Sequence, residues 1–222
     1  MATKNLQKEE NLTAEEKMIG KVSSFYEKNR KLIIIVTLVV VVAIIAAIVG
    51  IGVSNSVKNN AQIKIASLEQ RYGELILEEN PDYSSLITDL ESMVKGSSYP
   101  SVKAAYLLGL VYYEQKNYAS AQSYFEKVYE MNSKVYLAPV ALVNAAACAE
   151  DQGNTAKALE LYNQVSSDYP ESGVAAKAAF NAARINLLQG NIQLAQASFA
   201  QLASAYPNSE YGKLAKNLAT VL

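Results

Sequence analysis

Three segments of this sequence repeat one another at a spacing of 37 residues. The register holds at an asparagine, an alanine, an aromatic residue and an aliphatic residue, in that order. These positions are Asn117, Asn154 and Asn191; Ala121, Ala158 and Ala195; Phe125, Tyr162 and Phe199; and Val128, Val165 and Leu202. A small residue precedes each repeated alanine by twelve positions: Gly109, Ala146 or Ala183. Such self-similarity is typical of helical solenoids, in which each unit buries its apolar face against its neighbours.

Each repeat contains two helical patterns separated by a short polar triplet. The triplets are Gln115-Lys116-Asn117, Gln152-Gly153-Asn154 and Gln189-Gly190-Asn191. Because glycine and asparagine tolerate the left-handed conformation that ends a helix, we interpret each triplet as a C-cap and turn. The small residues on both helices let the two backbones approach closely, and the repeated aromatic residue fills the space beyond. The sequence therefore predicts three helical hairpins over residues 102–208.

The flanking segments extend this array in both directions. Residues 54–101 are predicted to form a short polar linker, a helix over residues 61–79 that ends at Asn80-Pro81, and a degenerate first repeat. Residues 209–222 are predicted to form a capping helix, because the last repeat of a solenoid needs a cover for its apolar face.

Residues 32–53 form an uncharged stretch of 22 residues in which Thr37 is the one polar side chain. As a helix this stretch would be about 33 Å long, enough to cross a hydrocarbon core of about 30 Å. A cleaved signal peptide is the alternative, since Ser54-Asn55-Ser56 offers small residues for cleavage. Signal peptides have a short charged region before an apolar core of about 7 to 15 residues, however, whereas this stretch follows 31 residues. A single transmembrane helix is the prediction.

Basic residues predict the orientation of this helix. Five lie within the fifteen residues before it and two within the fifteen after it: Lys17, Lys21, Lys28, Arg30 and Lys31, against Lys58 and Lys64. The positive-inside rule therefore predicts that residues 1–31, a polar tail with a short amphipathic helix, are cytoplasmic. The repeats would then lie on the other side of the membrane. The inverted alternative is a receptor of an organelle membrane that faces the cytosol.

The composition argues against an enzyme. The chain has no histidine, so the commonest general base and metal ligand are missing, and Cys148 is the one cysteine. No nucleotide-binding or hydrolase motif occurs. A formal net charge of -1 without an extended basic face also argues against nucleic acid as a partner. We therefore predict no catalytic residue, cofactor, metal or small-molecule substrate.

The repeats resemble the tetratricopeptide repeat family. The matching residues are Leu108-Gly109, Tyr112, Tyr118, Ala121 and Phe125 in the first full unit, and Ala158, Tyr162, Pro170, Ala195, Phe199 and Pro207 in the next two. The family period is 34 residues, so this chain has three more between hairpins, a form that resembles the repeats of bacterial envelope proteins. The resemblance implies an all-α, right-handed helical solenoid with three clear hairpins and one degenerate hairpin.

The family binds its partners with the first helix of each hairpin, which implies a protein-binding groove in this chain. Its residues would be Lys103, Tyr106, Leu110, Tyr113, Val140, Val143, Asn144, Ala147, Glu150, Lys177, Phe180, Asn181 and Arg184. Only Lys177, Asn181 and Arg184 hint at the family's clamp for carboxylate tails. A groove of this mixed apolar and charged character suits a helix or an extended apolar segment better. For each residue, ordinary packing between repeats is the alternative.

The layout of the N-terminal region resembles a narrower family, the ancillary subunit of the bacterial SecYEG translocon. The resemblance rests on a short amphipathic helix, the segment FYEKNRK at residues 25–31, one spanning helix and the repeats that follow. It implies a single-pass protein of the bacterial inner membrane with a periplasmic C-terminal domain. Its partners would be translocon subunits, periplasmic chaperones or secreted clients. The alternative is a cell-envelope organiser in cell-wall or outer-membrane assembly.

Overall fold

The computed structural model describes residues 13–222, apart from the side chain of Glu16. The first twelve residues of the predicted polar tail lie outside this range. All regular structure within it is helical: α2 (Ala14–Leu75), α3 (Ser84–Met93), α4 (Tyr99–Glu114), α5 (Tyr118–Met131), α6 (Leu137–Asp151), α7 (Thr155–Asp168), α8 (Ala175–Leu188), α9 (Ile192–Ala205) and α10 (Glu210–Val221). The chain divides into two units, residues 1–60 and residues 61–222, which we describe separately.

Helix α2 is longer than predicted and runs without a break from the amphipathic segment through the apolar stretch. The predicted linker over residues 54–60 is wrong, because these residues are helical. A helix propagates more easily than it starts, and this polar segment has no proline or glycine to stop it. The helix ends at Leu75, four residues before the predicted end at Glu79.

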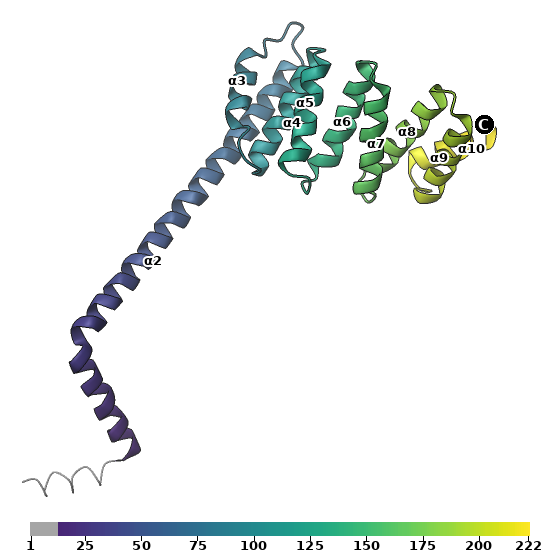
Figure 1. Ribbon diagram of the computed structural model, residues 1–222. Helices are drawn as coiled ribbons and strands as arrows, with labels where there is room; N and C mark the ends of the chain where they lie inside the picture. The colour runs from purple at the N-terminus through teal and green to yellow at the C-terminus, as the bar shows by residue number, and fades with distance from the viewer. Residues whose placement is uncertain (1–12) are drawn as a thin grey trace, which may run out of the picture. The chain divides into compact units, whose positions relative to one another are not determined.

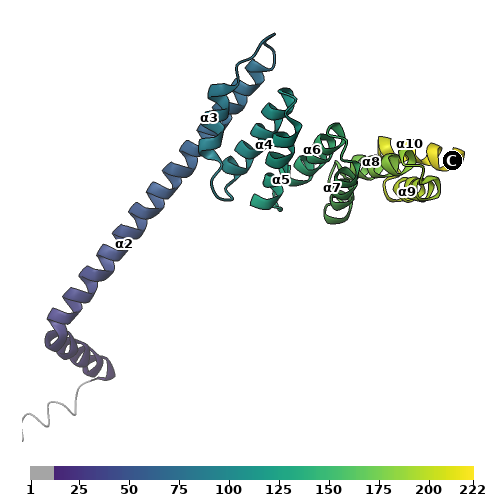
Figure 2. The same cartoon turned by 45° about the horizontal axis from the view of Figure 1, so that its top comes forward.

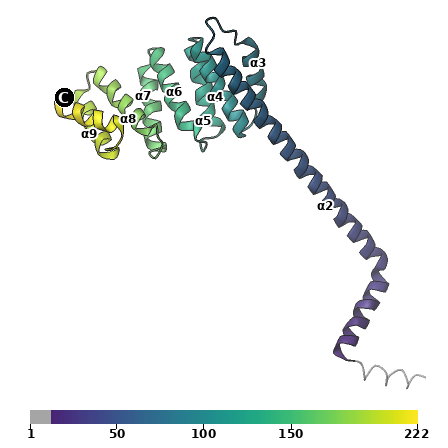
Figure 3. The ribbon, with the colours of Figure 1, turned by 180° about the vertical axis from the view of Figure 1, so that it is seen from behind.

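Residues 61–222 form a row of helical hairpins in chain order. Helices α4 and α5, α6 and α7, and α8 and α9 are the three hairpins, and each packs on the next. Figures 1 and 3 show this order from opposite sides, and Figure 2 shows α10 beside α9 at the C-terminal end of the row. Helix α10 contacts both α8 and α9. The three predicted hairpins are therefore confirmed.

The repeated positions form the core of this unit. The three repeated alanines and the three small residues on the preceding helices are buried, and so are the aromatic residues Phe125, Tyr162 and Phe199. The burial of one such aromatic side chain contributes roughly 1.5–3 kcal/mol to the stability of the folded unit. At the C-terminal end, Ala215 of α10 is fully buried against Phe199 and Leu202. Helix α10 thus covers the apolar face that the last hairpin would otherwise expose.

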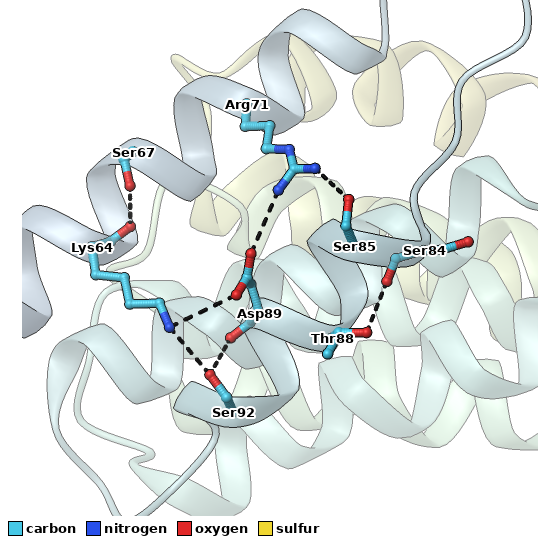
Figure 4. Close-up of polar contacts among 8 residues, drawn as sticks. All are labelled: Lys64, Ser67, Arg71, Ser84, Ser85, Thr88, Asp89 and Ser92. Carbon is cyan, nitrogen blue, oxygen red and sulfur yellow. Dashed lines mark hydrogen bonds and ion pairs between the residues drawn. The ribbon is translucent and has the colours of Figure 1, made fainter.

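The end of α2 packs against α3 and α4 as a degenerate hairpin. Ile65 and Leu68 of α2 join Leu86 and Leu90 of α3 in one apolar cluster. Outside this cluster, Asp89 of α3 pairs with two cations of α2, at 3.9 Å from Lys64 and 3.5 Å from Arg71 (Figure 4). These groups are partly exposed, so the pairs orient the helices but each adds at most about 1 kcal/mol.

The turn triplets differ from the prediction in the role of their asparagines. The middle residue is the left-handed one, with φ angles of 57° at Lys116, 75° at Gly153 and 79° at Gly190. The asparagine that follows has a negative φ and begins the next helix as its N-cap. Asn117 Oδ1 accepts a hydrogen bond from Ser120 N at 3.2 Å, and Asn154 Oδ1 accepts one from Lys157 N at 3.1 Å. The first two triplets therefore end one helix and cap the next, whereas Asn191 occupies the N-cap position of α9 without a side-chain capping hydrogen bond.

Replacing Lys116 with glycine is expected to raise the free energy of unfolding by about 0.5–1 kcal/mol. A side chain in the left-handed region costs about 1–2 kcal/mol, which glycine avoids. Glycine also has more conformational freedom to lose on folding, and this loss offsets part of the gain in stability. Gln115→Gly is the matched control, because Gln115 has a φ of -74° and needs no glycine. In denaturant unfolding, the midpoint should be higher than that of the native protein for Lys116→Gly and lower for the control. Equal midpoints would contradict backbone strain at Lys116.

The three extra residues of each repeat lie in links that contact one another. Tyr169, in the link after α7, donates a hydrogen bond from its hydroxyl to Ser133 O in the preceding link, at 2.7 Å. Tyr206, one repeat later, donates in the same way to Pro170 O at 2.9 Å. The tyrosine before each proline therefore ties its own link to the link one repeat earlier.

Candidate protein-interaction surface

The predicted groove residues lie on three helices of the repeat unit, α4, α6 and α8. We call them the first-helix surface. Four lie on α4, five on α6 and four on α8: Lys103, Tyr106, Leu110 and Tyr113; Val140, Val143, Asn144, Ala147 and Glu150; and Lys177, Phe180, Asn181 and Arg184. Twelve of them keep solvent access. Val143 is the exception: it is 3% exposed and belongs to the core. The prediction that Val143 lines a binding groove is therefore wrong.

Polar contacts between consecutive first helices use part of this surface. Asn144 Nδ2 of α6 donates to the Tyr106 hydroxyl of α4 at 3.2 Å. Arg184 Nη2 of α8 donates to Glu150 Oε2 of α6 at 2.5 Å, within an ion pair. These bonds join residues 38 and 34 positions apart, about one repeat each. They hold neighbouring hairpins together and leave less of the surface free for a partner.

Glu150 also joins α6 to the second helix of its own hairpin. The hydroxyl of Tyr162 on α7 donates to Glu150 Oε1 at 2.9 Å. Burial raises the pKa of Tyr162, and the hydrogen bond to the Glu150 carboxylate raises it further. The carboxylate thus has a donor on each oxygen. Because it also compensates the charge of Arg184, a clamp for a partner's carboxylate on Lys177, Asn181 and Arg184 is weakened.

The aromatic residues of the surface differ in how far they reach solvent. Phe180 lies between two rings, with its centroid 5.5 Å from that of Phe199 and 5.5 Å from that of Tyr211. Its face is therefore largely used by packing between α8, α9 and α10. Tyr113, in contrast, is 39% exposed although its ring pairs with Tyr118 at 5.5 Å. Tyr113 is therefore the more accessible of these two aromatic residues.

Lys103 is held at the N-terminal end of the surface. Its Nζ lies 2.6 Å from Glu69 Oε2 of α2 and 5.9 Å from the centre of the Tyr99 ring. The side chain therefore joins α4 to the last turns of α2. Lys177, its counterpart on α8, is exposed.

A pocket of about 640 Å³ lies beside this surface, between the link before α6 and the link before α8. Its apolar lining includes Val135, Tyr136, Pro139 and Val140, and Tyr169 and Pro170 close it from the second link. Of these residues, only Val140 is predicted from the sequence. Pro139 lies in α6 but is not among the predicted groove residues, and the others belong to two links far apart in sequence. The repeated Tyr-Pro pair is the signal in the sequence that points to these links.

The described part of the chain offers no assembly for metal or redox chemistry. Residues 13–222 contain no group of three His, Cys, Asp or Glu side chains that could hold a metal ion. Burial raises the pKa of the Cys148 thiol to about 12, with a further contribution from Asp151. At neutral pH this thiol is protonated and inaccessible, so it serves as an apolar core residue.

Comparison with known proteins identifies the repeats. Two tetratricopeptide repeat models match residues 100–171 and residues 149–210. Among solved structures, PcrH from Pseudomonas aeruginosa is 18% identical, with 58% of this chain and 96% of PcrH covered and a TM-score of 0.48. PcrH in complex with the chaperone binding region of PopB is 19% identical, with 58% of this chain and 99% of PcrH covered and a TM-score of 0.47.

A third structure, of the nearly identical tetratricopeptide-like repeats of a kinesin light chain from Podosopora anserina, is 12% identical. The match covers 73% of this chain and 84% of the kinesin light chain structure, with a TM-score of 0.53. It supports the fold alone. The search of curated proteins gave no sequence match. Family models and hairpin geometry agree, and the chain therefore carries tetratricopeptide repeats across residues 100–210.

Proposed function

We propose that this chain is a membrane-anchored scaffold that holds protein partners on its first-helix surface. The repeats support the binding part of this proposal, because tetratricopeptide repeats act as interaction surfaces rather than as catalytic centres. The observation that carries it is the accessible row on α4, α6 and α8, where Tyr113 and Lys177 remain free of the ion pairs that hold Lys103 and Arg184. An aromatic anchor and a cation suit a partner segment that is amphipathic and carries a negative charge.

The apolar part of α2 supports the anchor. The described part of the chain contains one helix long and apolar enough to cross a membrane, with a mean hydropathy of 3.6 in its most apolar window. Apart from Ile33, the large side chains of residues 32–53 are exposed, Leu38 by 65% for example. An exposed apolar stretch of this size requires lipid or protein to cover it.

The orientation is tested with a reporter at the C-terminus. The excess of basic residues before the span supports a cytoplasmic N-terminus, and with it the proposal that the repeats are periplasmic in a bacterial cell. A reporter that is active only in the periplasm, fused after Leu222, should give signal. A reporter active only in the cytoplasm should stay silent at the same site. The reverse pair of results would overturn this topology and leave the scaffold facing the cytosol.

The finer part of the proposal is an ancillary role at the translocon, between secreted clients and periplasmic chaperones. A photocrosslinking residue at Tyr113 should recover translocon subunits, chaperones or secreted proteins from native membranes. The matched control places the same residue at Glu160, which is exposed on α7 outside the first-helix surface. Equal products from both sites would contradict the binding surface. Cell-wall or outer-membrane assembly proteins recovered from Tyr113 alone would favour the envelope organiser instead.

A further inference from the structure

The last repeat has no charged residue over residues 185–209, although 18% of the chain is charged. The second helices of the two earlier hairpins both carry charges: Glu126, Lys127 and Glu130 on α5, and Lys157, Glu160 and Asp168 on α7. Helix α9, at the same place in the last hairpin, carries none. Its solvent-facing side is built from glutamine, serine and alanine together with two large aliphatic residues. The difference lies on the surface, where charge normally keeps a protein soluble.

Three large aliphatic side chains gather at the turn between α8 and α9 and face solvent. Leu188 is 74% exposed, Ile192 50% and Leu194 55%. We call them, with the exposed alanines of α9, the α8–α9 apolar patch. These alanines are Ala197, Ala200 and Ala205. The exposed alanines are distributed along α9, among the exposed polar but uncharged side chains of Gln193, Gln201 and Ser204.

The middle repeat shows that the fold does not require apolar residues at this turn. Asp151, Thr155 and Lys157 occupy the positions of Leu188, Ile192 and Leu194, one period earlier. Lys157 Nζ lies 3.0 Å from Glu160 Oε1 and 3.8 Å from Glu126 Oε2. The same turn geometry is therefore compatible with a charged and solvated surface. The apolar residues in the last repeat contribute little to the hairpin and point to a contact outside it.

We propose that the α8–α9 apolar patch is a self-association surface, at which two copies of this chain meet about a twofold axis. In such a contact, residues near the axis meet their own copies, so a charge there would approach an identical charge. The α8–α9 apolar patch has no such charge, whereas the α5 and α7 helices carry three charges each. A nucleic acid or an acidic lipid surface would find no cation here to bind.

The size of the patch sets the strength of this contact. Helix α9 has 14 residues and is therefore about 21 Å long. One helix face of this length is smaller than the roughly 800 Å² that each partner buries in a stable interface. The dimer is therefore reversible and depends on concentration, and it is measured best with copies in their own membrane.

Cysteine crosslinking of the full chain tests the proposal. Gln193 is exposed between Ile192 and Leu194, and Ala156 is the exposed residue one period earlier. The buried Cys148 thiol should leave the native chain unreactive. In membranes of expressing cells, a short bismaleimide should link Gln193→Cys chains into a product of twice 24.1 kDa that contains two differently tagged copies. Ala156→Cys is expected to give no such product.

The interface variant exchanges the patch for the residues of the middle repeat: Leu188→Asp, Ile192→Thr and Leu194→Lys. In the Gln193→Cys chain it should lower the yield of the doubly tagged product at least about tenfold. Its melting curve checks folding, and Leu194→Lys alone is the second variant should the triple change unfold the domain. Three results would overturn the proposal: an unchanged yield in the folded variants, equal yields from Gln193→Cys and Ala156→Cys, or a product of another mass that contains a different protein.

Discussion

Replacing Gly212 with alanine is expected to lower the free energy of unfolding of the repeat unit by about 3 kcal/mol. A Cβ atom at this position would lie 1.9 Å from Tyr206 O, and this oxygen belongs to the backbone. The link cannot yield easily, since Tyr206 also bonds the preceding link through Pro170 O. Helix α10 would have to move off Phe199 and Leu202, and overpacking of this kind costs about 1–3 kcal/mol before the exposed core is counted.

Gly173 is the matched control for this substitution. It lies in the preceding link, and a Cβ atom there would meet nothing within 4 Å. Gly173→Ala should therefore leave the free energy of unfolding within about 0.5 kcal/mol of that of the native protein. If Gly212→Ala behaved like Gly173→Ala in denaturant unfolding, α10 would not be docked as the structure has it, and the last hairpin would need another cover.

The repeat register made the core of this fold predictable. A position that recurs every 37 residues occupies the same place in each hairpin, so the burial of Ala121, Ala158 and Ala195 follows from the period itself. The continuity of α2 did not follow. Residues 54–60 are polar and read as a linker, but a helix continues through such a segment when both neighbours are already helical.

The candidate surface was predictable in its backbone position and less so in its contacts. Spacing places Tyr106, Asn144 and Arg184 on accessible sides of first helices. It cannot reveal that Arg184 pairs with Glu150, because that contact depends on the offset between two neighbouring hairpins. The turn asparagines show the same limit. Both a C-cap and an N-cap favour asparagine, and only the backbone angles decide between them.

The free energy of unfolding is expected to fall by about 4 kcal/mol between pH 10 and pH 12 because of buried tyrosines. Burial is the largest cause that raises the pKa of Tyr162, and it also raises those of Tyr72, Tyr124 and Tyr169 to about 12. An unfolded tyrosine loses its proton near pH 10. Above that pH the unfolded chain holds fewer protons than the folded chain, so unfolding releases protons and a rise in pH favours it.

The individual contributions follow from exposure. Tyr162 is 2% exposed, and each pH unit of difference is worth about 1.4 kcal/mol for a group of this kind. Tyr72, Tyr124 and Tyr169 are only partly buried, so solvent screening reduces their share to a fraction of that value. Below pH 10 all four are protonated in both states, and their contribution to stability is complete and constant.

The variant Tyr162→Phe separates this effect from general alkaline denaturation. It removes the largest titrating group and the donor to Glu150 Oε1, so the protein should be less stable than the native chain at neutral pH. Its stability should then fall less steeply above pH 10, and the two curves should approach each other towards pH 12. Denaturant unfolding followed by circular dichroism at each pH measures both curves. Parallel curves would show that Tyr162 ionises alike in the folded and unfolded chains, and that its hydroxyl is not held in the core by Glu150.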